Sequence, residues 1–334
     1  KPDDGHAMVT LSAMCYALSV LLVRVATDRG APLVLTLFTR FAFQCPFFFL
    51  QMVVQRVPPV PATAFGRQIL VISGGLVTIA CMGYVTASAY APLGHANAVC
   101  GTFPIGTILV ARLWLNEPFG FSGLPAMLLT ACGVAFIYFD SPAASAFSSK
   151  TSNFEALGYA AAAVSAMANS FAYVAVRHAG GAMHPLQNMM VYSFLGLLFT
   201  LPVAINRAGH AFSLHAWWSA MPALAGVCVL GALAQMLLCY GSMTPGVSAG
   251  IASLLSSSEM VWAYALQVVI LREPTSHTAA AGVALVFVGI MTSLIEHSCC
   301  GPEAVHLMRT KLVDPPPSPT AVMTALEEER LIDV

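Results

Sequence analysis

Two charged side chains lie deep inside apolar stretches of this sequence. Glu259 occurs in ASLLSSSEMVWAYALQVV (residues 252–269), and Arg40 occurs in LFTRFAFQ (residues 37–44). A charge at the centre of a bilayer costs roughly 2.5–3.5 kcal/mol on insertion scales, so such a side chain must face a wet cavity or a partner, or be neutralised. Glu259 is therefore predicted to bind a substrate group or a proton. The alternative is a structural hydrogen bond to another helix, made as the neutral acid.

Arg40 offers a different chemistry. A guanidinium group is always charged and grips carboxylates or phosphates through two parallel hydrogen bonds. Arg40 is predicted to bind an anionic group or to pair with Glu259, and the alternative is an interfacial anchor that reaches water by snorkelling. Arg24 and Arg112 lie closer to the ends of their apolar segments, where snorkelling is the expected behaviour.

Uncharged polar residues could line the same cavity. In GYAAAAVSAMANSFAYVAV (residues 158–176), small residues recur every four positions, which is typical of close helix packing in membranes, and a neighbouring stripe leads to Asn169 and Tyr173. The other candidates are polar side chains inside separate apolar segments: Tyr84, Gln235 and Gln267. For all five, the alternative is a hydrogen bond between helices.

Other classes of chemistry find no support in the sequence. No nucleophile stands beside a base at a readable spacing, no Walker A motif occurs, and no His, Asp or Cys cluster has metal-ligand spacing. We therefore predict no enzyme activity, no cofactor and no metal. The net charge of −1 gives no reason to expect binding to nucleic acid.

The surrounding segments are those of a membrane protein. Of 334 residues, 58% are hydrophobic and 9% are charged, against about 25% charged residues in soluble domains. A membrane-spanning helix needs about 20 apolar residues. The sequence predicts an all-α protein with ten such helices, at residues 7–28, 32–54, 68–90, 93–115, 121–139, 155–177, 184–205, 216–240, 246–270 and 276–296.

The distribution of basic residues predicts the orientation. With an even number of spans, both termini lie on one side, together with Lys1, Arg56, Arg67, Arg112, Arg177, Arg309, Lys311 and Arg330. The other side holds Arg29, Lys150, Arg207 and Arg272. Because basic loops stay in the cytoplasm, both termini are predicted to be cytoplasmic.

The two halves of the chain repeat each other. GTFPIGTILVARLWLNEP (residues 101–118) and SSEMVWAYALQVVILREP (residues 257–274) both end in Leu-x-Glu-Pro, 156 positions apart. The predicted units are 1–140, a connecting loop at 141–154, 155–297, and a disordered cytoplasmic tail at 298–334. Five spans per unit force the second copy to insert upside down, and such inverted repeats place substrate sites near the membrane midplane.

These halves resemble a known family. FTRFAF (38–43), AYAPLGHANAV (89–99), FPIGTILVARLWLNEP (103–118) and SSSEMVWAYALQVVILREP (256–274) are similar to the EamA repeat of the drug/metabolite transporter superfamily, and most like the solute carrier 35 group, subgroup G. The resemblance implies a ten-helix transporter fold without specifying a substrate. Ser-Glu-Met at 258–260 replaces the Glu-Pro more usual there, which predicts a straighter ninth span.

The functional hypothesis is a secondary transporter that moves a small polar metabolite, such as an organic anion, by alternating access. In this hypothesis Arg40 attracts the anion, and Glu259 binds a polar or cationic group or a proton. The alternative hypothesis is a membrane scaffold that transports nothing and acts through its tail. In that tail Glu327, Leu331 and Ile332 resemble an acidic dileucine signal, which predicts a sorting adaptor as a partner.

Overall fold

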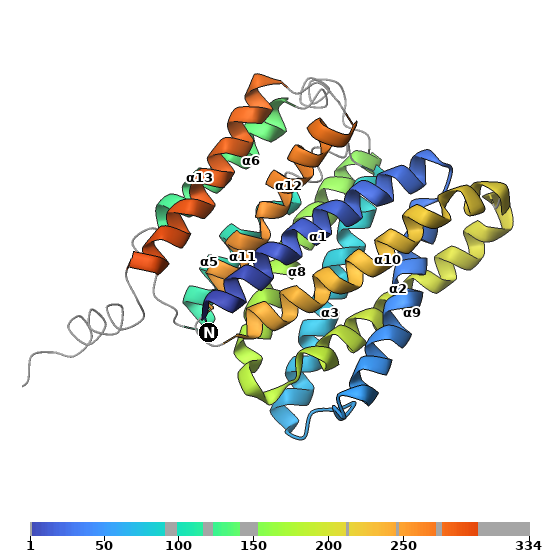
Figure 1. The fold of residues 1–334 in the computed structure, drawn as a ribbon, viewed down its shortest axis with the longest axis horizontal. Coiled ribbons are helices and arrows are strands. Elements are labelled where there is room, and N and C mark those ends of the chain that lie inside the picture. Colours follow the sequence, from blue (N-terminus) through green and yellow to red (C-terminus); the bar gives the residue numbers. More distant parts are fainter. Residues whose placement is uncertain are drawn as a thin grey trace, which may run out of the picture.

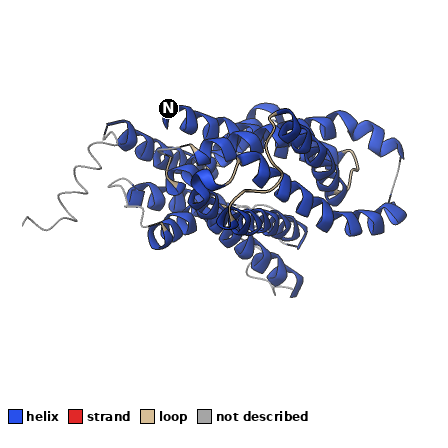
Figure 2. Cartoon of the chain, turned by 90° about the horizontal axis from the view of Figure 1, so that it is seen from below, coloured by secondary structure: helices blue, strands red, loops and turns tan. Residues whose placement is uncertain are grey.

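The computed structural model describes residues 2–90, 99–115, 123–140, 153–211, 214–244, 247–271 and 276–299. Every regular element within these ranges is a helix (Figure 2). The sorting residues Glu327, Leu331 and Ile332 lie outside the described residues, as does most of the predicted tail.

The first half of the chain contains α1 (Pro2–Asp28), α2 (Leu33–Val54), α3 (Ala64–Tyr90), α5 (Phe103–Trp114) and α6 (Gly123–Asp140). The second half contains α8 (Asn153–Ala179), α9 (Pro185–Ala211), α10 (Leu214–Met243), α11 (Ala249–Ser256), α12 (Ser258–Leu266) and α13 (His277–Cys299). A short 3₁₀ turn, η1 (Gly180–Ala182), follows α8, and a π-helical segment, η2 (Gln267–Leu271), follows α12.

The helices have the length and composition of membrane spans. Among the described residues, seven helices are long and apolar enough to cross a bilayer, and the shorter apolar helices are Phe103–Trp114, Leu124–Phe136 and Ala280–Thr292. Large apolar side chains such as Leu113, Trp218 and Val269 are exposed on them, as lipid contact requires. The chain is an integral multi-pass membrane protein, and ten spans remains the predicted number.

Helices pair mainly across the two halves of the chain. In Figure 1, α1 lies beside α10 and α13 lies beside α6. The other main pairs are α3 with α8 and α2 with α9. Each half therefore buries its small-residue faces against the other half, and the core lies between them.

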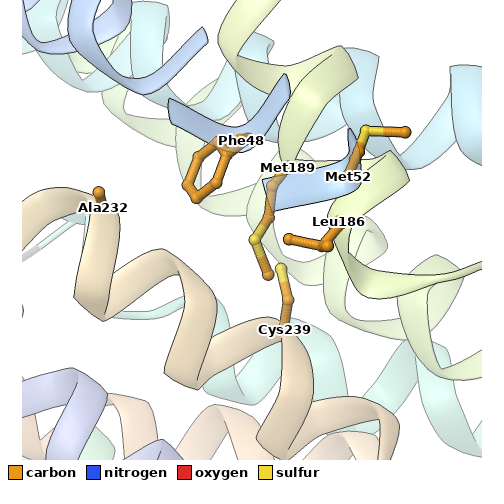
Figure 3. Packing of buried hydrophobic residues seen from close by; sticks show 6 residues of the cluster. All are labelled: Phe48, Met52, Leu186, Met189, Ala232 and Cys239. Atoms are coloured by element: carbon orange, nitrogen blue, oxygen red, sulfur yellow. The ribbon is translucent and has the colours of Figure 1, made fainter. Parts of the chain in front are cut away.

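One apolar cluster shows how this core is built. Phe48 and Met52 of α2 meet Leu186 and Met189 of α9, and α10 closes the cluster with Ala232 and Cys239 (Figure 3). The aromatic ring and the flexible methionines fill the space where three helices cross. The cluster fixes the position of α2 relative to α9 and α10.

Equivalent hydrogen bonds join the two halves. LSAM (11–14) in α1 and VSAM (164–167) in α8 are 153 positions apart. Ser12 Oγ donates to the Ala234 carbonyl at 2.8 Å, and Ser165 Oγ donates to the Ala80 carbonyl at 2.7 Å. A serine-to-carbonyl hydrogen bond thus joins α1 to α10, and an equivalent bond joins α8 to α3.

The helices α6 and α13 pack through reciprocal glycine contacts. A Cβ atom built on Gly133 would lie 2.5 Å from the Gly282 carbonyl oxygen, and one built on Gly289 would lie 2.9 Å from the Ala126 carbonyl oxygen. Both Gly133 and Gly289, and Ala126 and Gly282, are 156 positions apart. The later residue of α6, Gly133, contacts the earlier residue of α13, Gly282, while the earlier Ala126 contacts the later Gly289. The helices α6 and α13 therefore run antiparallel.

The ninth predicted span is divided into two helices, and its expected straightness stays a prediction. α11 ends at Ser256, α12 begins at Ser258, and Ser257 forms a turn between them. Ser257 Oγ donates to the Leu254 carbonyl at 2.6 Å, and Ser253 Oγ donates to the Gly250 carbonyl at 2.8 Å. Serine hydroxyls that bond to nearby carbonyls compete with the helical ladder, so the break needs no proline.

Candidate functional site

Arg40 is held between α1 and α10. Its Cζ lies 5.4 Å from the centre of the Tyr16 ring, in cation–π geometry. On the other side, a Cβ atom built on Gly231 would lie 2.8 Å from Arg40 Nε and 3.1 Å from Arg40 Cζ. The absence of a side chain at Gly231 therefore lets the guanidinium approach the backbone of α10, and Arg40 is half-buried.

Tyr16 extends this contact into a hydrogen-bonded chain. Its hydroxyl donates to Gln235 Oε1, and Gln235 Nε2 contacts Cys239 Sγ at 3.5 Å. Gln235 is buried. The predicted candidate Gln235 thus lies next to Arg40, and Tyr16 of α1 connects them.

Glu259 lies in the first turn of α12, directly after the break at Ser257. A carboxylate at this position is favoured by the positive end of the α12 dipole. Glu259 and Arg40 are both half-buried, and no ion pair joins them in the described part of the chain.

Tyr173 brings α8 to the same region. Its ring stacks on Phe103 of α5, with centroids 5.5 Å apart and planes at 18°. Tyr173 also packs with Ala252 of α11, about one turn before Ser257. Tyr173 therefore lies beside the break that positions Glu259.

The helices α3 and α9 complete the arrangement. Tyr192 of α9 and Cys81 of α3 pack in one cluster with Phe41, the residue that follows Arg40. The ring of Tyr192 meets Phe41 edge-on, with centroids 5.3 Å apart. We call the set Tyr16, Arg40, Cys81, Tyr173, Tyr192, Gln235 and Glu259 the interior polar network.

The remaining candidate residues from the sequence are not part of the interior polar network. Tyr84 and Asn169 are half-buried on α3 and α8, and none of the contacts above assigns them to the interior polar network. Gln267 begins η2, and its side chain lies outside the described residues. Arg24 and Arg112 are exposed, as expected for snorkelling side chains.

Sequence reasoning missed Tyr16, Tyr192 and Gln44. The repeat itself contained a signal for Tyr16, because aligning LSAM with VSAM sets Tyr16 opposite the chosen candidate Asn169. Tyr192 and Gln44 lie in apolar segments, and their roles follow only from the neighbours that the fold provides.

Several buried polar atoms in this region have no hydrogen-bond partner among the described residues. They are Arg40 Nε, both amide atoms of Gln44, Ser258 Oγ and Tyr264 Oη. An unsatisfied buried polar group costs about 1–3 kcal/mol, so native proteins rarely keep one without a ligand or water to bind it. Over the described ranges, no group of three His, Cys, Asp or Glu side chains has a metal-binding arrangement.

Comparison with known proteins identifies the family. The sequence profile of the EamA-like transporter family matches residues 4–139 and 156–295. The chain belongs to the EamA-like transporter family. The two matched segments of this EamA-like protein fall within the two predicted repeats, and the predicted drug/metabolite transporter family is confirmed.

Solved structures share the fold of this EamA-like protein. Twenty-nine chains of known structure match it. One of them, titled "Crystal structure of protein", is 17% identical, aligns with a TM-score of 0.67, and covers 89% of this chain and 98% of its own. The comparison with curated proteins gives no match. The EamA-like family consists of membrane transporters, which agrees with the prediction that the chain is not an enzyme.

Proposed function

We propose that this EamA-like protein is a secondary transporter that moves a small polar metabolite, an organic anion, across a membrane by alternating access. The observation that carries the proposal is that Arg40 and Glu259, both half-buried in apolar helices, form no ion pair with each other in the described part of the chain. Opposite charges that do not neutralise each other remain available to a ligand. In this proposal Arg40 binds the anionic group of the substrate.

The proposal includes ten spans arranged as two inverted five-helix repeats. The equivalent bonds of Ser12 and Ser165 and the reciprocal contacts of Gly133 and Gly289 support a two-fold relationship between the halves. Because α6 and α13 are antiparallel, a two-fold axis that exchanges them must run across the helices, within the membrane plane. Such symmetry provides two related conformations that open to opposite sides.

The network lies where these conformations would differ. It takes side chains from α1, α2 and α3 of the first half, and from α8, α9, α10 and α12 of the second. The turn at Ser257 ends one helical segment and starts the next. A turn of this kind absorbs backbone rotation more easily than a continuous helix, so we propose that α12 moves Glu259 during exchange between the two states.

Glu259 has two roles open to it in this mechanism. It binds a polar or cationic group of the substrate, or it binds a proton and couples transport to a proton gradient. The two are separated by imposing a pH difference across a vesicle membrane. Proton coupling requires that the gradient drive accumulation in the wild-type protein and fail to do so in Glu259→Gln.

The finer family relationship and the orientation belong to the same proposal. Similarity to the solute carrier 35 group, subgroup G, rests on the sequence motifs, and cytoplasmic termini rest on the distribution of basic residues. The scaffold hypothesis depends on Glu327, Leu331 and Ile332, which lie outside the described residues, and no observation favours it.

Reconstitution in liposomes tests the proposed function. Uptake of isotope-labelled carboxylates is measured for the wild type, Arg40→Ala and Glu259→Gln. We expect uptake of at least one carboxylate, and loss of about tenfold or more in Arg40→Ala, the equivalent of about 1.4 kcal/mol in binding. Arg24→Ala is the matched control, because Arg24 is an exposed arginine in an apolar helix, and it should transport normally. The proposal is wrong if Arg40→Ala retains the flux of Arg24→Ala.

A further inference from the structure

Gln44 of α2 is fully buried, with an exposed fraction of 0%. Neither its Nε2 nor its Oε1 has a hydrogen-bond partner among the described residues. A buried primary amide without a hydrogen-bond partner on either atom is unfavourable for folding. In a membrane protein an apolar residue could occupy such a position without this cost. The amide of Gln44 can therefore bind a ligand group that both donates and accepts a hydrogen bond.

Gln44 shares a helix face with Arg40. The two residues are four positions apart, which places their Cβ atoms about 6 Å from each other on one face of α2. The same face continues to Phe48, which packs with Ala232 of α10 and Met189 of α9. Since Arg40 also lies against α10 at Gly231, this face of α2 is turned into the protein rather than to lipid.

The unsatisfied atoms on this face specify a ligand. Arg40 Nε is a donor without a partner in the described structure. Gln44 adds a donor at Nε2 and an acceptor at Oε1. A carboxylate satisfies the arginine. Only a group that both accepts and donates a hydrogen bond satisfies both amide atoms of Gln44. A hydroxyl group is the smallest group that does so.

We propose that Arg40 and Gln44 together form a subsite for a hydroxycarboxylate, in which Arg40 binds the carboxylate and Gln44 binds a hydroxyl group close to it. This inference rests on the proposed function and adds to it the chemical class of the substrate. The hydroxyl accepts from Gln44 Nε2 and donates to Gln44 Oε1. An ammonium group in the same place would donate to Oε1 but leave Nε2 unsatisfied.

Two matched series of ligands test the subsite on the purified full-length protein. Lactate, propionate and alanine carry a hydroxyl, a hydrogen and an ammonium group on the same carbon, as do malate, succinate and aspartate. Binding is measured by thermal stabilisation, since a ligand that binds the folded state raises its melting temperature. We expect the hydroxy acid to bind about tenfold or more tightly than both analogues in at least one series, because a site built around a polar group discriminates strongly against its loss.

Gln44→Met is the decisive variant, because it keeps the side-chain length and removes both polar atoms. The preference for the hydroxy acid should fall to about twofold or less, as expected when the pairing partner is gone. Gln51→Met is the control: it makes the same substitution on the same helix and should retain the preference. If Gln44→Met does not fold, Gln44→Leu serves instead, since it also removes both polar atoms and should also lose the preference.

The outcomes separate this inference from the proposed function. If Arg40→Ala abolishes carboxylate uptake but the wild type binds hydroxy, deoxy and amino analogues equally, the transporter proposal stands and the hydroxycarboxylate subsite is wrong. Equal preference in Gln44→Met and wild type also rejects the subsite. If hydroxy acids bind with the expected preference but no labelled carboxylate enters liposomes, the subsite stands and the transport proposal fails.

Discussion

Gly133 and Gly289 make the same contact from opposite sides of one interface. Each brings the backbone of its own helix against the backbone of the other, Gly133 at Gly282 and Gly289 at Ala126. In lipid there is little hydrophobic drive to join helices, so close approach through small residues supplies van der Waals contact instead. The relationship identifies α6 and α13 as corresponding elements of the two halves.

Replacing Gly133 should weaken this interface. In Gly133→Ala, the new methyl group would meet the Gly282 carbonyl oxygen at 2.5 Å and the Val286 backbone nitrogen at 2.9 Å. Backbone atoms cannot move aside as a side chain can, so the helices must separate. We expect a loss of about 1–3 kcal/mol, typical of overpacking, measured as a lower melting temperature in detergent.

Gly75→Ala is the matched control for that substitution. A Cβ atom on Gly75 of α3 meets no atom within 4 Å. Alanine favours a helix by about 1 kcal/mol over glycine, so Gly75→Ala should leave the melting temperature unchanged or raise it. A melting temperature lowered equally by both substitutions would contradict the packing argument.

The hydrogen bonds of Ser12 and Ser165 should contribute similar stability. Both hydroxyls are buried and donate to a carbonyl of the partner helix at 2.8 and 2.7 Å. We expect Ser12→Ala and Ser165→Ala each to cost about 0.5–1.5 kcal/mol. Because the sites lie in different helix pairs, the double variant should show the sum of the two losses in an unfolding titration. Strong non-additivity would mean that the bonds are not independent equivalents.

Gly231→Ala should impair transport more than stability. The added methyl group would lie 2.8 Å from Arg40 Nε, and the long arginine side chain can shift to relieve the contact. The guanidinium would then leave its place over Tyr16. We expect carboxylate uptake to fall by about tenfold, or about 1.4 kcal/mol, with a melting temperature close to that of the wild type. Normal uptake in Gly231→Ala would show that the position of Arg40 is unimportant.

Removing the serines at the break should make the ninth span more continuous. In Ser257→Ala/Ser258→Ala, the bond from Ser257 Oγ to the Leu254 carbonyl is lost, and alanine favours the helix. We expect the protein to become equally or more stable while transport slows several-fold, if the turn permits movement of Glu259.

Thr292→Ala provides the comparison for the serine variant. Thr292 Oγ1 donates to the Val288 carbonyl at 2.7 Å within the continuous helix α13. Its loss removes a local hydroxyl–carbonyl bond without affecting a break, so transport should continue at the wild-type rate. Equal slowing in both variants would show that the turn at Ser257 has no special role.

The sequence by itself determined the class of protein and its repeat. A chain with 58% hydrophobic residues cannot form a soluble surface, and Leu-x-Glu-Pro recurring after 156 residues reveals a duplicated unit. It also made Arg40 and Glu259 candidate site residues, because a charge in an apolar helix is expensive wherever that helix lies. These properties are local in the chain, so composition and spacing are enough to find them.

Only the tertiary structure decided which residues meet. Tyr16 joins Arg40 to Gln235 across helices more than 190 positions apart in the sequence. Gln44 gains its importance from being buried without a partner, which depends on what α9 and α10 place around it. The division of the ninth span at Ser257 is likewise seen only in the structure, because serine hydroxyls can bond either outward or to their own backbone. Side-chain surroundings come from helix packing, and packing is set by contacts between segments that are distant in the chain.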